Sequence, residues 1–174
     1  MKKSTIKVRP ETPADLSGIR AVNEAAFGRP NEADLVDLCR SRGHVSLSLV
    51  AVDEGRVTGH VLFTPLACDP PCPGWHALGL GPIAVLPELQ GQGIGSRLMD
   101  IGLEMARSQG IDFVVLLGDP RYYCRFGFIP GREFGLTSDY GDGDEFQARE
   151  LRPGVLKGAK ARVVYVQEFK ESDC

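Results

Sequence analysis

Three glycines at alternate positions, Gly91, Gly93 and Gly95, stand between a long apolar stretch and an amphipathic segment of helical spacing. Glycine has no Cβ atom to hold a ligand away from the backbone, and the N–H groups at a helix start attract anions. The segment therefore predicts a loop that binds a pyrophosphate or a similar anion. The alternative is structural, since glycines at such a junction also allow close packing.

Two common nucleotide-binding motifs do not describe this loop. A P-loop needs Gly-Lys-Ser/Thr, which is absent, and the dinucleotide fingerprint spaces its glycines as G-x-G-x-x-G. Gly79-Leu80-Gly81-Pro82-Ile83-Ala84 fits G-x-G-x-x-A by letters, but Pro87 follows before any helix begins. Nucleotide or dinucleotide binding is therefore a minor hypothesis, which competition by NAD or ATP would support.

The first half of the chain predicts a strand, two helices and a hairpin. Residues 6–9 alternate like a strand that Pro10 closes, and Thr12-Pro13 is typical of a helix start. Apolar residues at helical spacing then run to Ala26, and a second helix, with Asn31 as its N-cap, runs to about Arg42. Two β-rich runs on either side of a turn at residues 53–56 predict an antiparallel hairpin, residues 45–52 and 57–65.

The second half places the glycine loop between a strand and a helix. The apolar run 75–86 contains Pro82, which cannot donate to a strand ladder and so predicts a bulge or splay. A helix follows the loop and ends near Gly110, and the run 113–117 suits a strand covered on both faces. Asp119-Pro120 predicts a short helix that stops at Gly127. The remaining strands are expected at residues 145–151 and 162–169.

These motifs together resemble one family. Gln90-Gly91-Gln92-Gly93-Ile94-Gly95 matches the Q/R-x-x-G-x-G/A signature of the GNAT superfamily of acyl-CoA-dependent N-acetyltransferases, at the junction where that family has it. Tyr122-Tyr123-Cys124-Arg125-Phe126-Gly127-Phe128 looks like the family's aromatic-x-x-x-Gly-Phe segment. The resemblance covers residues 6–129, and the stretch from Gly118 to Phe128 is similar to a bacterial subgroup known mostly as predicted N-acetyltransferases.

The resemblance implies a fold and a cofactor site. The fold class is α/β (α+β), with a mixed, mostly antiparallel sheet of about six to seven strands, flanked by helices and splayed at strands 4 and 5. Residues 1–174 would form one domain, with its core at 6–129 and C-terminal strands at 130–174 completing the sheet and the acceptor side. Acetyl-CoA would be the co-substrate, without a metal. Its binding residues would be Ile83, Ala84 and Val85 for pantetheine, and Gln90, Gly91, Gln92, Gly93, Ile94, Gly95 and Ser96 for pyrophosphate.

The resemblance also implies the reaction. A primary amine would attack the thioester directly in a ternary complex, and Tyr123, four residues before Gly127, would be the acid near the departing thiol. Tyr122 is a second candidate for that role. The general base stays open among His76, Glu24, Glu32, Glu88 and a water chain. The acceptor, a small molecule or a peptide amine, has no readable code in the sequence, and the family resemblance is compatible with a homodimer. The alternative function is a CoA-binding module or sensor without productive catalysis.

Composition excludes several other classes. Lys and Arg number 20 against 23 Asp and Glu, a net charge of −3, so no basic field exists to hold nucleic acid. Apolar runs are far shorter than the roughly 20 residues of a membrane span, and the basic start, residues 1–7, does not resemble a secretory signal. We therefore expect a cytoplasmic protein. Cys68 and Cys72 have a spacing that could hold zinc, but the two further ligands that a tetrahedral site needs do not follow at a suitable distance. Residues 139–144 have the composition of a calcium loop but lack its pattern of ligands, so we expect a polar surface loop there.

Overall fold

The computed structural model describes residues 6–174 and forms two compact units. Of the described residues, the first unit contains 6–62, 82–102 and 167–174, and the second contains 63–81 and 103–166. The boundaries between the units fall inside strands and a helix, so each unit consists of several chain segments. The expectation of one domain over residues 1–174 stays a prediction. The comparison with a secretory signal rests on the basic start, residues 1–7. Most of that segment, residues 1–5, lies outside the described residues.

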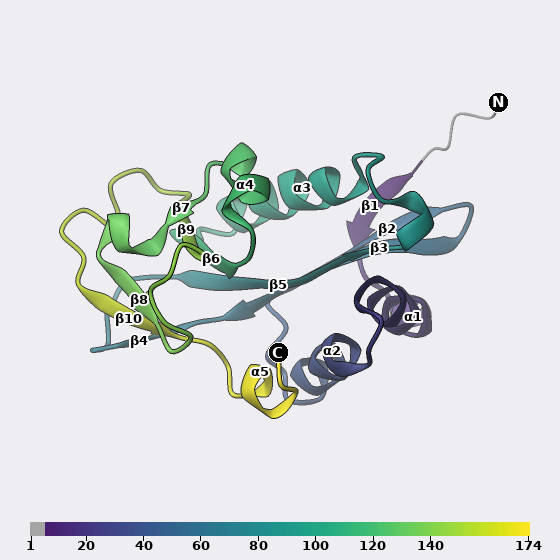
Figure 1. Cartoon of the computed structure of the whole chain (residues 1–174), viewed down its shortest axis with the longest axis horizontal. Coiled ribbons are helices and arrows are strands. Elements are labelled where there is room, and N and C mark those ends of the chain that lie inside the picture. Colours follow the sequence, from purple (N-terminus) through teal and green to yellow (C-terminus); the bar gives the residue numbers. More distant parts are fainter. Residues whose placement is uncertain (1–5) are drawn as a thin grey trace. The chain divides into compact units, whose positions relative to one another are not determined.

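The main sheet has seven strands in the order β1-β2-β3-β5-β6-β9-β7 (Figure 1). Strands β5 and β6 are parallel, whereas β1 with β2, β6 with β9 and β7 with β9 are antiparallel. The expected mixed sheet is thus confirmed. Its strands are β1 Lys7–Pro10, β2 Leu47–Asp53, β3 Arg56–Pro65, β5 Ala77–Val85, β6 Phe113–Leu117, β7 Ile129–Pro130 and β9 Phe146–Glu150.

The first unit contains the helices α1 (Leu16–Phe27), α2 (Asn31–Ser41) and α5 (Glu168–Glu171), and most of α3 (Ile94–Ser108). A capping box between Thr12 and Asp15 starts the short 3₁₀ turn that leads into α1, as the sequence predicts. Helix α2 packs against α1 and α5. The prediction that Asn31 caps α2 is wrong: Pro30 is the N-cap, and the Asn31 side chain donates to the Ser172 carbonyl at 3.0 Å.

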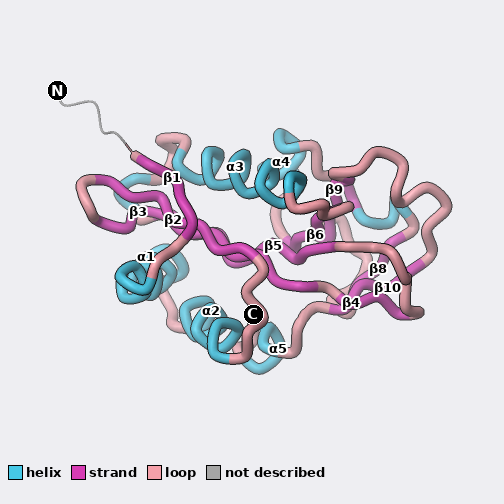
Figure 2. The backbone as a smooth tube through the Cα atoms, turned by 180° about the vertical axis from the view of Figure 1, so that it is seen from behind, coloured by secondary structure: helices cyan, strands magenta, loops and turns pink. Residues whose placement is uncertain are grey.

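The second unit contains β6, β7, β9, the short helix α4 (Pro120–Tyr123) and a further sheet of three strands (Figure 2). That sheet has the order β4-β10-β8, from Ala67–Asp69, Ala161–Val164 and Leu136–Ser138. The predicted strand over residues 162–169 is therefore correct only in its first part, because β10 ends at Val164 and α5 begins at Glu168. The C-terminal strands also divide between two sheets instead of completing one.

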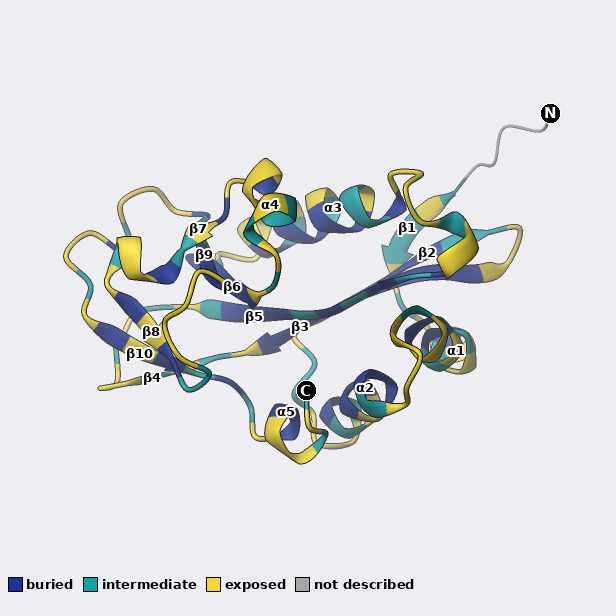
Figure 3. Ribbon diagram, in the orientation of Figure 1, coloured by how far each residue is buried: buried dark blue, intermediate teal, exposed yellow. Residues whose placement is uncertain are grey.

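Each unit has its own buried residues (Figure 3). Alternation in the strands and helical spacing in α1, α2 and α3 direct the apolar residues inward, where their burial drives folding. In the first unit the fully or almost fully buried residues include Ile19, Val22, Leu35, Leu49, Leu98 and Met99. In the second unit they include Phe113, Val115, Phe128, Phe146 and Val163.

Strand β5 continues past its parallel partner. The β5–β6 ladder joins Ala77–Leu80 to Phe113–Leu116, and β5 then runs on for residues 81–85. Gly81, with φ 151°, and Pro82 stand at the point where the ladder ends. Proline has no N–H to donate, so a strand edge without a ladder accommodates it at low cost. The position of Pro82 thus agrees with the predicted splay of this strand.

Candidate cofactor-binding and catalytic site

The glycine loop has a backbone that only glycine adopts readily. Gly91 and Gly93 have φ angles of 75° and 83°, in the left-handed region, where other residues are strained. A Cβ atom at either position would meet nothing within 4 Å. The two glycines are therefore required by backbone conformation rather than by crowding, and their backbones face open space that a ligand can enter.

The loop leads directly into a helix whose first N–H groups are available. Helix α3 begins at Ile94, and its first helical hydrogen bond runs from the Arg97 N–H to the Gly93 carbonyl at 3.0 Å. The first four N–H groups of a helix have no partner within it, and they carry the positive end of the helix dipole. Ile94 is buried, whereas Gly91, Gln92, Gly93 and Arg97 are exposed. Residues 91–96 thus present backbone donors, anchored by one apolar side chain, that fit an anionic phosphate.

Side chains tie the loop to the end of β5. The Gln90 side-chain amide donates to the Val85 carbonyl at 3.1 Å, and that of Gln92 donates to the Glu88 carbonyl at 3.4 Å. The Leu86 N–H donates to the Thr58 carbonyl of β3 at 3.0 Å. The first unit therefore brings the two predicted groups of cofactor-binding residues together: Ile83, Ala84 and Val85 with residues 90–96.

Tyr123 belongs to the second unit, at the end of α4. Asp119 caps this helix by accepting from the Arg121 N–H at 2.9 Å, as the sequence predicts. The Tyr123 ring packs edge-on against Tyr122 and Phe128, and it lies so close to the Gly118 backbone that a Cβ atom there would collide with it. Burial, assisted by Tyr122, raises the pKa of Tyr123 to about 12. Its hydroxyl therefore keeps its proton at neutral pH and is a hydrogen-bond donor.

Tyr122 has a different environment. Its ring lies under the Arg125 guanidinium, 4.6 Å from ring centroid to Cζ, and 5.6 Å from the Phe126 ring. A cation over an aromatic face is attracted to the ring, which fixes the side chain through its π-system. Tyr122 thus has a structural role in packing α4 that the sequence does not distinguish from the role expected of Tyr123.

The carboxylates considered as general base already pair with arginines. Glu24 pairs with Arg20 at 2.9 Å, Glu32 with Arg29 at 2.5 Å and Glu88 with Arg56 at 3.0 Å. A hydrogen bond from its own N–H, assisted by Arg56, lowers the pKa of Glu88, which is opposite to what a base needs. His76 precedes β5, with its Nδ1 3.8 Å from Asp112 Oδ2. The three carboxylates are thus paired with arginines, and the identity of the general base stays a prediction.

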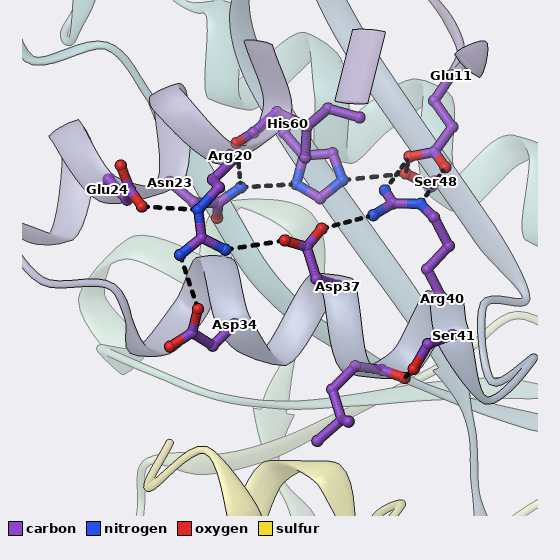
Figure 4. Close-up of polar contacts among 12 residues, drawn as sticks. Glu11, Arg20, Asn23, Glu24, Asp34, Asp37, Arg40, Ser41, Ser48 and His60 are labelled. Carbon is purple, nitrogen blue, oxygen red and sulfur yellow. Dashed lines mark hydrogen bonds and ion pairs between the residues drawn. The ribbon is translucent and has the colours of Figure 1, made fainter. Parts of the chain in front are cut away.

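A buried polar chain in the first unit has no signature in the sequence (Figure 4). Ser48 donates to Glu11, and since a hydroxyl has one proton, it must accept from His60 Nε2, 3.0 Å away. His60 Nδ1 then accepts from Asn23 Nδ2 at 3.1 Å. Burial lowers the pKa of His60 to about 4, so the ring is neutral. Arg40 closes the chain with two hydrogen bonds to Glu11, at 3.1 and 2.9 Å.

Residues 6–174 contain neither a metal-binding cluster nor a membrane-spanning helix. No group of three or more His, Cys, Asp or Glu side chains is placed to hold a metal ion there. None of the helices in this range is both long and apolar enough to cross a membrane. Cys68 and Cys72, the half-site of the sequence, are free thiols, and burial raises the pKa of Cys68 to about 11.

Comparison with known proteins identifies the family. Residues 7–131 match the acetyltransferase (GNAT) domain. The chain is 36% identical to the uncharacterized N-acetyltransferase YhbS of Escherichia coli K12 over 93% of this chain and 97% of YhbS, and 43% identical to YjhQ of the same organism over 67% and 66%. The structure of E. coli YhbS in complex with CoA superposes with a TM-score of 0.89 at 32% identity, covering 98% and 94% of the two chains.

A second solved structure agrees. A GNAT family acetyltransferase from Brucella melitensis in complex with acetyl-CoA has a TM-score of 0.79 and 36% identity, over 96% of this chain and 99% of that one. Family, fold and the signature loop therefore point to the same conclusion. This chain belongs to the GNAT acetyltransferases and is an acyltransferase.

Proposed function

We propose that this protein transfers the acetyl group of acetyl-CoA to a primary amine, which attacks directly in a ternary complex. The observation that carries the proposal is the loop of residues 90–96, where the left-handed Gly91 and Gly93 have open space at their Cβ positions and lead directly into the start of α3. Relatives with matching folds bind CoA or acetyl-CoA, which supports the same ligand here. Because backbone donors and a helix dipole neutralise the pyrophosphate, an acidic protein needs no basic cluster for this.

The cofactor residues have separate tasks. The N–H groups of Gly91, Gln92, Gly93, Ile94, Gly95 and Ser96 would bind the pyrophosphate oxygens, and the side chain of Gln90 would hold the loop on β5. Ile83, Ala84 and Val85 lie beyond the β5–β6 ladder, so their backbone groups suit the peptide-like amides of pantetheine. A backbone N–H at this end of β5 would stabilise the developing oxyanion.

Tyr123 would donate a hydrogen bond to the departing sulfur. The thioester supplies an activated acetyl group: as the amine nitrogen bonds to its carbonyl carbon, the carbon–sulfur bond breaks and the thiolate leaves. With the pKa of Tyr123 at about 12 and a thiol pKa near 8.5, complete proton transfer costs about 5 kcal/mol. Tyr123 therefore stabilises the thiolate by hydrogen bonding, and the proton of the amine passes to water.

The first test is binding measured by isothermal titration calorimetry. Acetyl-CoA is expected to bind with a Kd in the micromolar range, about −8 kcal/mol, whereas NAD and ATP neither bind nor compete. No heat with acetyl-CoA would mean that the loop is structural and would overturn the proposal. Binding by NAD or ATP alone would favour a nucleotide site instead.

The second test is release of thiol from acetyl-CoA with a panel of amines, each with a blank without protein. We expect at least one primary amine to accelerate release above both blanks. Stoichiometric binding of acetyl-CoA, with release at the background rate for every amine, would instead indicate a CoA-binding module. The panel should include cationic, aromatic and peptide amines, so that the most reactive class identifies the acceptor.

A further inference from the structure

Gly59 of β3 is a glycine whose backbone does not require one. Its φ angle lies outside the left-handed region in which Gly91 and Gly93 are found, so an L-residue could adopt the same conformation. What distinguishes Gly59 is the space beside it. An ideal Cβ atom would lie 3.0 Å from Leu98 Cδ1, 3.1 Å from Ile94 Cγ2 and 3.2 Å from the Ala84 carbonyl oxygen. Real Cβ atoms rarely approach other atoms this closely.

The three neighbours belong to the two parts of the cofactor site. Ile94 is the buried first residue of α3, and Leu98, one turn later, is fully buried. Ala84 lies in the segment of β5 proposed for pantetheine. The carbonyl of the preceding residue of β3, Thr58, accepts from the Leu86 N–H at 3.0 Å and so fixes the end of β5 at the same place. A single point on β3 therefore supports both the helix start and the strand end.

We propose that Gly59 is a positioning residue for acetyl-CoA, because its missing side chain sets how closely α3 and β5 approach β3. This proposal rests on the proposed function. A methyl group at residue 59 must displace the first turn of α3, the end of β5 or both by a few tenths of an ångström. The donors of residues 91–96 would then no longer match the pyrophosphate, although none of them is altered.

The experiment measures the Kd of acetyl-CoA by calorimetry for the wild type, Gly59→Ala and Gly59→Ala/Leu98→Ala. We expect Gly59→Ala to weaken binding about tenfold. Removing the Leu98 side chain creates space beside residue 59, so the double variant should recover to within about threefold of Leu98→Ala alone. A merely structural loss would not recover in this way, because Leu98→Ala removes a buried side chain and is itself destabilising.

Gly18→Ala is the matched control. Its Cβ would lie 2.7 Å from Val57 Cγ2, so it crowds the same strand β3, but from α1, which supplies no proposed cofactor residue. We expect Gly18→Ala to lower the melting temperature in the absence of ligand, as Gly59→Ala does, and to leave the Kd within about twofold. An equal loss of affinity in both variants, or none in Gly59→Ala, overturns the proposal.

The outcomes separate this inference from the function on which it rests. If the wild type does not bind acetyl-CoA, both are overturned. If the wild type binds and Gly59→Ala binds equally well, only the proposed role of Gly59 is overturned. Should Gly59→Ala not fold, the double variant is compared with Leu98→Ala alone, and a Kd about tenfold weaker than that of Leu98→Ala overturns the proposed relief by Leu98.

Discussion

His60 Nε2 donates to Ser48 Oγ at 3.0 Å, and Ser48 in turn donates to Glu11, so the hydrogen bonds run in one direction along a buried chain. The order of donors follows from counting protons, because the Ser48 hydroxyl has only one to give. This chain of hydrogen bonds joins β3 and β2 to the segment after β1. Arg40 of α2 supplies the positive charge that compensates Glu11.

Replacing Ser48 by alanine should destabilise the protein by about 2 kcal/mol, since it leaves the buried His60 Nε2–H without a partner and removes one of the two hydrogen bonds that Glu11 Oε2 accepts, the other being from Arg40. Urea denaturation checks this prediction. Ser46→Ala, at an exposed position two residues earlier, is the control and should change the free energy of unfolding by less than about 0.5 kcal/mol. Equal effects of the two substitutions would contradict a specific role for the chain.

The same histidine predicts a dependence of stability on pH. The pKa of His60 is about 4 in the folded protein, lowered by burial, and near 6.5 in the unfolded chain. Below pH 6.5 the unfolded chain therefore binds a proton that the folded protein does not. Stability should fall as the pH drops from about 6.5 to 4, by on the order of 3 kcal/mol, and this contribution should level off below.

Denaturation curves at a series of pH values between about 4 and 7.5 measure this loss. Glu11 also faces His60, and its own acid titration contributes, so the wild type is compared with His60→Gln, which retains an N–H donor. The variant should lose markedly less stability between pH 6.5 and 4 than the wild type. A slope in His60→Gln equal to that of the wild type would refute the assignment.

Local signals predict the glycine loop and its neighbouring elements well. Alternating glycines, the helical spacing that follows and the Asp119-Pro120 start of α4 act over a few residues, and the structure has each of them at the expected place. The buried chain could not be predicted in this way, because Glu11, Asn23, Ser48 and His60 have no common spacing and meet only in the fold. Strands β4, β8 and β10 have three or four residues each, and they are stabilised by pairing with distant segments.

Gly93→Ala should weaken acetyl-CoA binding about tenfold, because alanine resists the left-handed backbone that aims the N–H groups of the loop. Gly28→Ala is closely matched: Gly28 has φ 68°, ends α1 in the same unit and also has nothing within 4 Å of its Cβ position. Both variants should lose about 1 kcal/mol of stability in thermal melts. Calorimetry should then show a weaker Kd for Gly93→Ala only, and a parallel loss in Gly28→Ala would speak against a ligand-specific role.

Tyr123→Phe should slow thiol release with the most reactive amine by about ten- to a thousandfold and leave the Kd of acetyl-CoA within about twofold. The substitution keeps the ring that packs on Tyr122 and Phe128, and it removes only the hydroxyl proposed to donate to sulfur. Tyr122→Phe, whose ring stays under Arg125, should turn over within about threefold of the wild type. Unchanged turnover in Tyr123→Phe, or a greater loss in Tyr122→Phe, would remove Tyr123 from the mechanism.

The pH profile of the wild type adds an independent check on Tyr123. A tyrosine with the ordinary pKa near 10 would lose its proton, and with it the rate, as the pH rises through that value. Burial raises the pKa of Tyr123 to about 12, so turnover at saturating amine should show no decline attributable to this group up to about pH 10.5. An alkaline decline in turnover near pH 9 to 10 that disappears in Tyr123→Phe would contradict this prediction. It would show that the Tyr123 phenol is more solvated than its packing indicates.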